Sequence, residues 1–299
     1  MPQYDIIILT DARYEVPDEK DWYHAQLLGE ERLLMTALEA RGLRTKRVAW
    51  SNPHYDWSLA RGAVFRSTWD YFEQFATFSA WMERMAKGPL QLFNSADLVR
   101  WNMSKYYLRD LAAKGVNMPQ TRFLERGSKT TLREEIQATG WNDAILKPVV
   151  SGGARHTYRL NDSNLDAHEM LLQYLLRNES MMLQPFLGSV LTHGELSLMA
   201  MDGRCTHAVR KIAKQGDFRV QDDHGGTVQP HTPTADEIAF AEHAVAACPH
   251  EPLYARVDVL RDDAGALSLV ELEVVEPELF FRFHPPAAEA LAIAIASRL

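Results

Sequence analysis

The 299-residue sequence has few cysteines and no long apolar run. Its two cysteines, Cys205 and Cys248, lie far apart and match neither a zinc-knuckle spacing nor a disulfide framework, which favours a reducing compartment such as the cytoplasm. No stretch of about 18 uninterrupted apolar residues occurs, so no transmembrane helix is expected. The apolar run Ile6–Leu9 is too short for a signal sequence and lacks a basic flank, so it indicates a buried strand.

An excess of basic residues is also absent. The chain has 32 Lys and Arg residues against 40 Asp and Glu residues, and its formal net charge is -8. Such a chain has no general electrostatic attraction to nucleic acid or to an anionic membrane, so we expect neither as a partner. Small molecules are the expected ligands. With 46% hydrophobic residues, the chain can bury a large core in one lobed domain or in two domains.

Strand-like and helix-like patterns alternate along residues 1–100, which we take as a first domain. Helical spacing of apolar residues predicts helices over Gln26–Arg41 and Tyr71–Lys87. This alternation is typical of an open, mostly parallel α/β sheet. The predicted strands are Tyr4–Leu9, Arg44–Trp50 and Gly62–Arg66. The apolar face expected to be buried in the second helix consists of Phe72, Phe75, Phe78, Met82 and Met85.

Two further regions follow. Residues 101–182 mix helices with a strand and suit a small α+β lobe, whereas residues 183–299 are mainly strands and suggest an antiparallel sheet with a closing helix. In residues 101–182 we predict the helices Tyr106–Lys114 and Leu165–Leu176 and the strand Ala144–Val149. In the second we predict the strands Met181–Phe186, Glu195–Met201, Thr206–Ile212, Tyr254–Leu260 and Ser268–Val275, and the helices Ala235–Ala247 and Ala287–Leu299.

A glycine-containing turn follows the apolar strand that contains Lys147. Its small residues, Ser151, Gly152 and Gly153, can turn backbone N–H groups toward an anion, so a phosphate-binding loop is one interpretation. An ordinary hairpin turn is the other, because such residues are common in turns. The spacing does not match the Walker A motif, which requires a lysine directly before a helix-opening Ser or Thr.

Three carboxylates lie on two predicted strands. Arg256 and Asp258 are two residues apart in one strand, and Glu271 and Glu273 in the other, so each pair shares a face of its sheet. Carboxylates gathered on one face are costly unless cations neutralise them, and their oxygens suit Mg²⁺. A solvated charged face is the alternative, but the apolar residues on both sides of Glu271 and Glu273 favour a central strand.

Several cations and histidines are scattered along the sequence. Each cation is by itself expected at the surface, and only the fold could bring them to phosphates or to a substrate carboxylate. These cations are Lys105, Arg210, Lys211, Arg219 and Arg256. The chain has no His-Glu-x-x-His and no Gly-x-Ser-x-Gly motif. We therefore interpret four histidines as structural polar residues rather than catalysts, namely His156, His193, His207 and His224.

Taken in order, these features resemble the ATP-grasp superfamily, in which two α+β lobes hold ATP between them. The resemblance runs from about Ser95 to His284. It implies phosphate-facing lysines, a flexible loop over the phosphates, an interlobe hinge that pairs with adenine and an acid near the ribose. The nucleotide-binding residues implied in this way are Lys105, Lys147, Ser151, Gly152, Gly153, Gln184, Phe186, Leu187, Glu195 and Lys211.

The same resemblance implies a metal site and catalytic cations. Asp258, Glu271 and Glu273 would hold magnesium, with two ions expected and Mn²⁺ able to substitute. The family often has asparagine at the position of Glu273, which keeps an oxygen ligand. The resemblance also implies three cations that would stabilise the charge of the transition state, namely Arg256, Lys211 and Arg219.

The N-terminal third narrows the resemblance. The segments Arg66–Tyr71, Val99–Asn102 and Glu276–Phe280 resemble the glutathione-synthetase-like branch that includes the cycloserine-forming ligase. Within this branch the candidate substrate contacts are Arg66, Thr68 and Arg219, whereas Trp69 and Tyr71 fit a packed corner between strand and helix.

The resemblance implies an ATP- and magnesium-dependent ligase. It would activate a carboxylate as an acylphosphate for attack by a nitrogen nucleophile, in another molecule or in the same one. Two alternatives stay open at this point, a kinase-like phosphotransferase on the same fold and a non-catalytic nucleotide-binding sensor. A degenerate sensor would be expected to lose phosphate lysines or metal ligands, and this sequence retains both. Ligases of this type are often dimers, so a homodimer is compatible with the resemblance.

Overall fold

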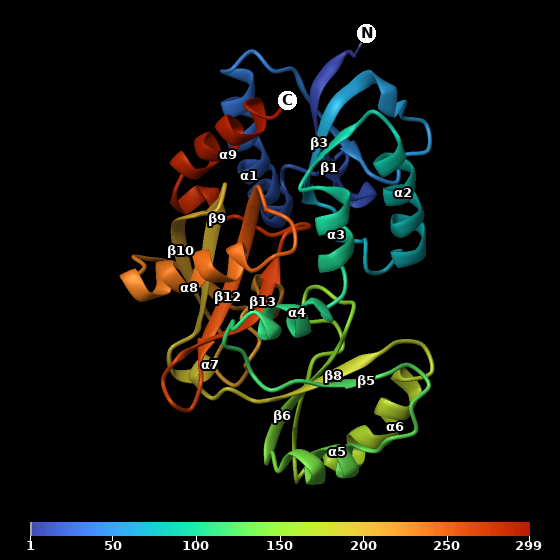
Figure 1. The fold of residues 1–299 in the computed structure, drawn as a ribbon, viewed down its shortest axis with the longest axis vertical. Helices are drawn as coiled ribbons and strands as arrows, with labels where there is room; N and C mark the ends of the chain where they lie inside the picture. Colours follow the sequence, from blue (N-terminus) through green and yellow to red (C-terminus); the bar gives the residue numbers. More distant parts are fainter. Residues whose placement is uncertain (1) are drawn as a thin grey trace.

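The computed structural model describes residues 2–299, and three β-sheets follow one another along the chain (Figure 1). The first sheet has the order β2-β1-β3-β4, and its strands pair in parallel. The mixed α/β and α+β class predicted from the sequence is confirmed. The strands of this sheet are β1 (Tyr4–Thr10), β2 (Thr45–Ala49), β3 (Ala60–Ser67) and β4 (Gln91–Phe93).

Helices pack on both faces of the parallel sheet. Ile6 and Ile8 of β1 join the core formed with α1 and α9, whereas Ile7 and Leu9 join the core formed with α2, because successive side chains of a strand point to opposite faces. Although α9 ends the chain, it lies beside α1 and completes the N-terminal domain (Figure 1). These helices are α1 (Trp22–Glu39), α2 (Phe75–Lys87) and α9 (Pro286–Ala296).

Both predicted helices of the first domain begin elsewhere than expected. Helix α1 begins at Trp22, before the predicted Gln26, because the Asp21 side chain accepts hydrogen bonds from the first backbone N–H groups and caps the helix there. Helix α2 begins at Phe75 rather than at Tyr71, since the four preceding residues form a turn. The two early boundaries were therefore wrong by four residues, in opposite directions.

The apolar face predicted for α2 is only partly buried. Phe78, Met82 and Met85 lie in the core, as expected. Phe75 is 37% exposed, and Phe72 lies in the preceding turn, where its ring lines a cavity. The prediction that Phe75 belongs to the core was therefore wrong, whereas Phe72 is partly buried and packs against the core although it precedes the helix.

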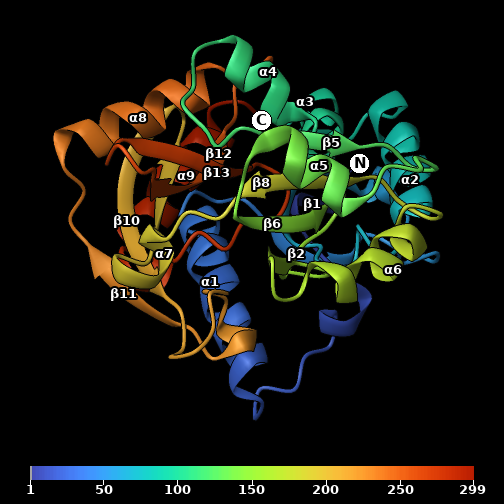
Figure 2. The ribbon, with the colours of Figure 1, turned by 90° about the horizontal axis from the view of Figure 1, so that it is seen from below.

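The second sheet forms a small lobe at the far end of the molecule (Figures 1 and 2). It is antiparallel, with the order β5-β8-β6-β7, and α5 and α6 pack on it. Two short helices, α3 (Ala96–Asn102) and α4 (Tyr107–Ala113), lead into it from the N-terminal domain. Its other elements are β5 (Arg122–Leu124), α5 (Leu132–Thr139), β6 (Asp143–Pro148), β7 (Tyr158–Asn161), α6 (Leu165–Leu175) and β8 (Met181–Pro185).

The third sheet is antiparallel, as predicted, and has the order β11-β10-β9-β12-β13. Helix α8 (Ala235–Ala246) packs on it, and the short α7 (Ser189–Thr192) connects it to the central lobe. Strand β11 was not predicted, because its mostly exposed side chains give it no apolar alternation. The strands are β9 (Glu195–Met201), β10 (Arg204–Ile212), β11 (Thr227–His231), β12 (Tyr254–Arg261) and β13 (Leu267–Glu273).

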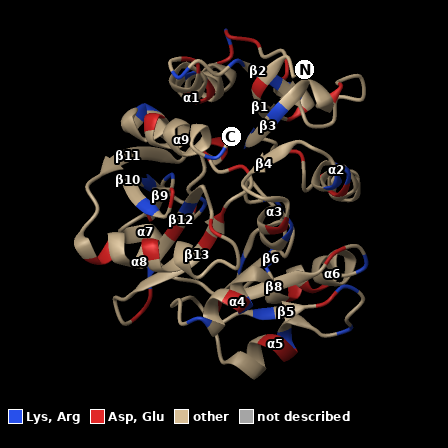
Figure 3. Cartoon of the chain, turned by 45° about the horizontal axis from the view of Figure 1, so that its top comes forward, with Lys and Arg blue, Asp and Glu red and all other residues tan. Residues whose placement is uncertain are grey.

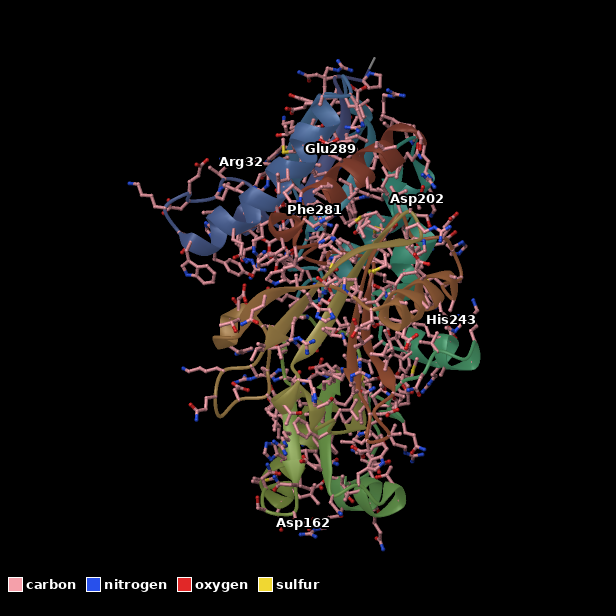
Figure 4. The ribbon with its side chains drawn as sticks, turned by 90° about the vertical axis from the view of Figure 1, so that its left-hand side faces the viewer. Arg32, Asp162, Asp202, His243, Phe281 and Glu289 are labelled. Atoms are coloured by element: carbon pink, nitrogen blue, oxygen red, sulfur yellow. The ribbon has the colours of Figure 1, made fainter. Side chains whose placement is uncertain are left out.

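The three parts are stacked along the long axis of the molecule. In Figure 4, Asp162 marks the tip of the central lobe, and Glu289 on α9 lies toward the opposite end. The predicted boundary between residues 182 and 183 falls inside β8, and that between 100 and 101 falls inside α3, so the exact division into domains stays a prediction. Among residues 2–299, no helix combines the length and apolar character needed to cross a membrane.

Candidate active site

A cavity of about 560 Å³ lies where the three parts of the chain meet. Residues of β6 and β8 line it on one side, residues of β10, β12 and β13 on another, and residues of α1 and the loop after β3 on a third. It brings together almost all of the predicted site residues. These are Arg66, Lys105, Lys147, Ser151, Gly152, Gly153, Gln184, Phe186, Leu187, Glu195, Lys211, Arg219, Arg256, Asp258, Glu271 and Glu273.

Two predicted cavity residues lie elsewhere. Thr68 follows the end of β3 and is fully buried outside the cavity lining. Arg210 precedes Lys211 in β10, so its side chain points to the opposite face of the strand, where its guanidinium donates to the carbonyl oxygen of His193. The prediction that Thr68 contacts substrate is therefore not supported by its position, and the fold does not bring Arg210 to the cavity.

Lys105 and Lys147 approach the cavity from different elements. The Lys105 ammonium lies 2.7 Å from Oε1 of Glu271 and donates to the carbonyl oxygen of Ser151 at 3.0 Å. Burial opposes the charge on Lys105, but the neighbouring Glu271 outweighs it and raises the pKa of this lysine. At Lys147 burial dominates and lowers the pKa, although Glu271 partly compensates. Lys105 is thus buried against the small-residue loop, and Lys147 is partly buried and lines the same cavity.

The loop at residues 151–155 combines glycine conformations with side-chain anchors. Gly153 has a φ of 56°, in the left-handed region that favours glycine. Arg155 pairs with Glu179 at 2.8 Å, and the Ser151 hydroxyl donates to the carbonyl oxygen of Arg155 at 3.1 Å, so the loop is anchored at both ends. A Cβ built on Gly152 would lie 2.7 Å from Cε1 of Phe72. The Phe72 ring of the N-terminal domain therefore packs directly against this loop.

The hinge between the two lobes lies at the end of β8. The amide nitrogen of the Gln184 side chain donates to Thr121 Oγ1 at 2.9 Å, and the backbone N–H of Phe186 donates to the carbonyl oxygen of Asp143. The Arg159 guanidinium lies 3.7 Å from the centre of the Phe186 ring. Together with the apolar cavity residues Ile145, Leu187, Leu260 and Val270, the hinge forms a less polar end of the cavity that suits a flat base.

Basic and acidic positions occur together on the neighbouring strands of the C-terminal lobe (Figure 3). Buried ion pairs link several of these side chains. Lys211 lies 2.5 Å from Oε1 of Glu195 and 3.4 Å from Oδ2 of Asp258, and the Ser197 hydroxyl donates to Asp258 at 2.5 Å. Burial alone would raise the pKa of Asp258, but Arg256 and Lys211 outweigh it and lower the pKa to about 2. The carboxylate of Asp258 therefore stays charged inside the protein.

Arg256 joins two of the predicted metal ligands. Its guanidinium donates to Asp258 at 2.9 Å and to Glu273 at 2.6 Å, and β12 and β13 place Asp258 directly opposite Glu271. Burial and the nearby carboxylates of Glu271 and Asp258 raise the pKa of Glu273 to about 7 in spite of Arg256. Glu273 is thus the acid of this cluster that holds a proton most readily.

The acidic residues fit a magnesium ion by their chemistry, since carboxylate oxygens are the ligands that Mg²⁺ prefers and an added cation would favour their charged forms. Within residues 2–299, however, no group of three His, Cys, Asp or Glu side chains is arranged to hold a metal ion. Glu271 turns to Lys105 and Glu273 turns to Arg256. Metal binding here would require these carboxylates to exchange their lysine and arginine partners for the ion, and the ligand set stays a prediction.

The opposite end of the cavity belongs to the N-terminal domain. Arg66 is buried, and its Nη2 lies 2.7 Å from Oε1 of Glu30 and donates to the carbonyl oxygen of Pro277 at 2.6 Å. Arg219 also lines the cavity, but its guanidinium is paired with Asp217 at 2.7 Å. Of the predicted substrate contacts, Arg66 and Arg219 therefore reach the cavity. Nη2 of Arg66 is already bound by Glu30 and Pro277, whereas Arg219 uses only Nε and Nη2, both toward Asp217.

Sequence reasoning missed several acids at this end. Glu30 and Glu31 lie on the buried face of α1, three and four residues after Leu27 and before Leu34. Two carboxylates within an otherwise apolar helical stripe could have indicated a site for paired charges, because isolated buried charges are costly. Glu278, which also lines the cavity, lies in a segment whose resemblance was noted without a role for its side chain.

Two α+β lobes with a hinge, buried lysines, a small-residue loop and an acidic strand pair around one cavity define the ATP-grasp ligase class. Comparison with known proteins agrees: residues 117–280 match the prokaryotic glutathione synthetase ATP-grasp domain, and residues 6–94 match the N-terminal domain of D-cycloserine synthetase DcsG. The chain belongs to the ATP-grasp ligase family that includes DcsG, and it is an enzyme that forms C–N bonds. Members of this family generally use ATP and Mg²⁺.

Individual relatives cover nearly the whole chain. The cycloserine biosynthesis protein DcsG of Streptomyces lavendulae is 32% identical over 286 residues, which cover 89% of this chain and 92% of the relative. The crystal structure of D-cycloserine synthetase DcsG superposes with a TM-score of 0.85 at 29% identity, over 98% of this chain and 99% of that one. D-alanine–D-alanine ligase from Bacillus anthracis, at 14% identity and a TM-score of 0.69 over 98% of this chain and 96% of that one, shares the fold.

Proposed function

We propose that this ligase closes a ring within one amino-acid-derived substrate, with O-ureidoserine as the candidate and cycloserine as the product. The observation that carries the proposal is the similarity to DcsG in both the N-terminal domain and the ATP-grasp domain. A cavity that continues from the hinge to the acids of the N-terminal domain supports it, because it offers one space for both the nucleotide and a small carboxylate.

In the proposed reaction the substrate carboxylate attacks the γ-phosphorus of ATP, and ADP leaves. The N–O nitrogen of the same molecule then attacks the acylphosphate, phosphate leaves and the ring closes. Water must also remove the carbamoyl group from that nitrogen, as CO₂ and ammonia, to give cycloserine. Lys105, Lys147 and Lys211 would hold phosphate oxygens, and Arg256 would stabilise the oxyanion that forms at the acyl carbon. Magnesium, when bound, would neutralise phosphate charge through Asp258, Glu271 and Glu273. We further infer two magnesium ions, replaceable by Mn²⁺, and a homodimer in the cytoplasm.

Free phosphate release from ATP and magnesium tests this function directly. The panel would include O-ureidoserine, serine, alanine and dipeptides, with product masses recorded. We expect release that depends on O-ureidoserine and a product that contains a new ring. A phosphorylated product without free phosphate would instead indicate the kinase-like reaction, and nucleotide binding without release for any substrate would favour the sensor.

A further inference from the structure

A group of polar side chains at the N-terminal end of the cavity has an unusual charge balance. The amide nitrogen of Gln26 donates to Oδ2 of Asp222 at 3.2 Å and to Oε1 of Glu278 at 3.3 Å, so two carboxylates from distant segments face one small space. The third carboxylate is that of Glu30, and all four residues line the cavity. None of them belongs to the phosphate and acid cluster described above.

Glu30 supplies an oxygen without a partner. Its Oε1 accepts hydrogen bonds from Arg66 and from the backbone N–H of Leu279, whereas its Oε2 is buried without a hydrogen-bond partner among the described residues. The residue is 7% exposed and lines the cavity. An unpartnered buried carboxylate oxygen costs free energy unless a ligand brings a donor to it.

The segment that carries Glu278 is fixed from both sides by the same ion pair. Arg66 binds the carbonyl oxygen of Pro277, directly before Glu278, and Glu30 binds the N–H of Leu279, directly after it. Glu278 itself pairs with Arg282, yet burial and the nearby Glu30 raise its pKa to about 7. The three carboxylates of Glu30, Asp222 and Glu278 are thus paired with only two arginines, Arg66 and Arg282. A further positive charge from a ligand would balance the third.

We propose that Gln26, Glu30, Asp222 and Glu278 form a subsite for the primary ammonium group of the substrate, which makes that substrate an α-amino acid with a free amino group. The assignment rests on the proposed function. An ammonium has three N–H donors. Oε2 of Glu30 has no partner, Oδ2 of Asp222 accepts from Gln26, and the carboxylate of Glu278, whose Oε1 accepts from Gln26 and Arg282, is the third acceptor group.

The position of the subsite matches the geometry of an α-amino acid. Arg256 Nη1 lies 3.5 Å from the carbonyl oxygen of Glu278, so the residue that would stabilise the reacting acyl group adjoins the segment that carries the subsite. In an α-amino acid, the ammonium nitrogen and the carboxyl carbon are both bonded to the same carbon. Binding of the ammonium by Glu278 and its neighbours would hold the carboxylate near Arg256. Trp69 and Tyr23, whose rings are 5.8 Å apart, add aromatic groups to the cavity wall, and such groups favour a cation.

Binding of matched ligands to the full-length enzyme tests the subsite. The probes are O-ureidoserine, its N-acetyl derivative and 3-(ureidooxy)propanoic acid, which lacks the amino group, each titrated calorimetrically in the presence of ADP and Mg²⁺. Because a charge-assisted hydrogen bond contributes about 1.5–3 kcal/mol, we expect the two analogues that lack the ammonium group to bind about 10- to 150-fold more weakly than O-ureidoserine. Equal affinity of the three ligands would overturn the subsite.

The variants Glu278→Gln and Asp222→Asn separate recognition from structural support. Each should weaken the binding of O-ureidoserine about tenfold or more and leave the affinity of the N-acetyl derivative unchanged, because that ligand has no ammonium group for these carboxylates to bind. A variant that weakens both ligands equally would show a purely structural role and would contradict the proposal. Glu289→Gln is the matched control, since Glu289 also pairs with an arginine but lies outside the cavity, and it should change neither affinity.

Turnover assays distinguish failure of the subsite from failure of the proposed function. Phosphate release with the deaminated analogue at the same kcat/KM as with O-ureidoserine would refute the subsite and leave the ligase reaction standing. Ammonium-dependent binding of O-ureidoserine without phosphate release would refute the ring-closing function and leave the subsite standing. Neither binding nor turnover of O-ureidoserine would refute both.

Discussion

The ammonium group of Lys105 lies 2.7 Å from Oε1 of Glu271 and 3.0 Å from the carbonyl oxygen of Ser151. One side chain, from the segment between α3 and α4, thus links the loop of the central lobe to strand β13 of the C-terminal lobe. In the absence of phosphates it neutralises an acid, and with phosphates bound it could bind them and release Glu271 for a metal ion. Such an exchange would connect nucleotide binding to the availability of the proposed metal ligand.

Replacement of Lys105 by methionine should weaken ATP binding about tenfold or more, because the variant loses a positive charge in a buried site and leaves Glu271 without its nearest cation. Displacement of a fluorescent nucleotide measures the effect. Lys129→Met is the control on the same lobe, since Lys129 is exposed and outside the cavity. Unchanged nucleotide affinity in Lys105→Met would remove this lysine from the phosphate site.

The double change Asp258→Asn and Glu271→Gln should lower magnesium-dependent turnover by at least about 100-fold, because neutral amides bind Mg²⁺ far less well than carboxylates. Both changes keep the size of the side chain, so cooperative thermal unfolding should persist. A magnesium titration of phosphate release measures the loss, with Asp263→Asn, in the exposed turn after β12, as the control. Persistence of normal turnover would assign the metal to other residues.

The sequence predicted the sheets better than it predicted the ends of the elements. Strands such as β9 and β12 are long and apolar, so their alternation was visible, and their place in an antiparallel sheet was predicted correctly. The start of α1 at Trp22 was missed because the residues that follow Asp21 have no apolar periodicity, and the cap decides the boundary. Strand β11 was missed because its pairing with β10, and not burial, defines it.

The sequence allowed prediction of which residues reach the candidate site. It did not allow prediction of which ion pairs those residues form there. The lysines and acids do reach one cavity, but the sequence could not show that Glu271 and Glu273 are each held by a cation. Nor could it show that Arg219 is already bound by Asp217, because ion pairs depend on side-chain geometry that spacing does not determine. Glu30 was overlooked because its helix was interpreted through its apolar residues alone.

Gly152 and Phe72 provide a test of how the N-terminal domain meets the phosphate loop. Gly152→Ala should lower kcat/KM for ATP about tenfold, because the new Cβ would lie 2.7 Å from Cε1 of Phe72 and displace the loop. Phe72→Leu in the same chain should restore much of the activity by removing part of the ring. Gly29→Ala, on α1 where a Cβ meets nothing within 4 Å, is the control. Absence of rescue would mean that the alanine acts through the loop itself.

His207 links β10 to the segment that follows β13, since its Nε2 lies 2.8 Å from the carbonyl oxygen of Leu279 and its ring stacks on His284. Burial lowers the pKa of His207 from 6.5 to about 4. The unfolded chain therefore takes up a proton at higher pH than the folded chain does. Stability from this group is fully present above about pH 6.5 and is lost as the pH falls toward 4.

Urea unfolding between pH 7.5 and about 4 measures this contribution. The free energy of unfolding of the parent chain should fall by up to about 3 kcal/mol more than that of His207→Gln, because each pKa unit corresponds to about 1.4 kcal/mol and glutamine does not titrate. His243→Gln is the control, since His243 is exposed on α8 and should leave the pH dependence unchanged. If the curves of His207→Gln and the parent chain run parallel, His207 is protonated equally in both states and does not hold Leu279 as a neutral donor.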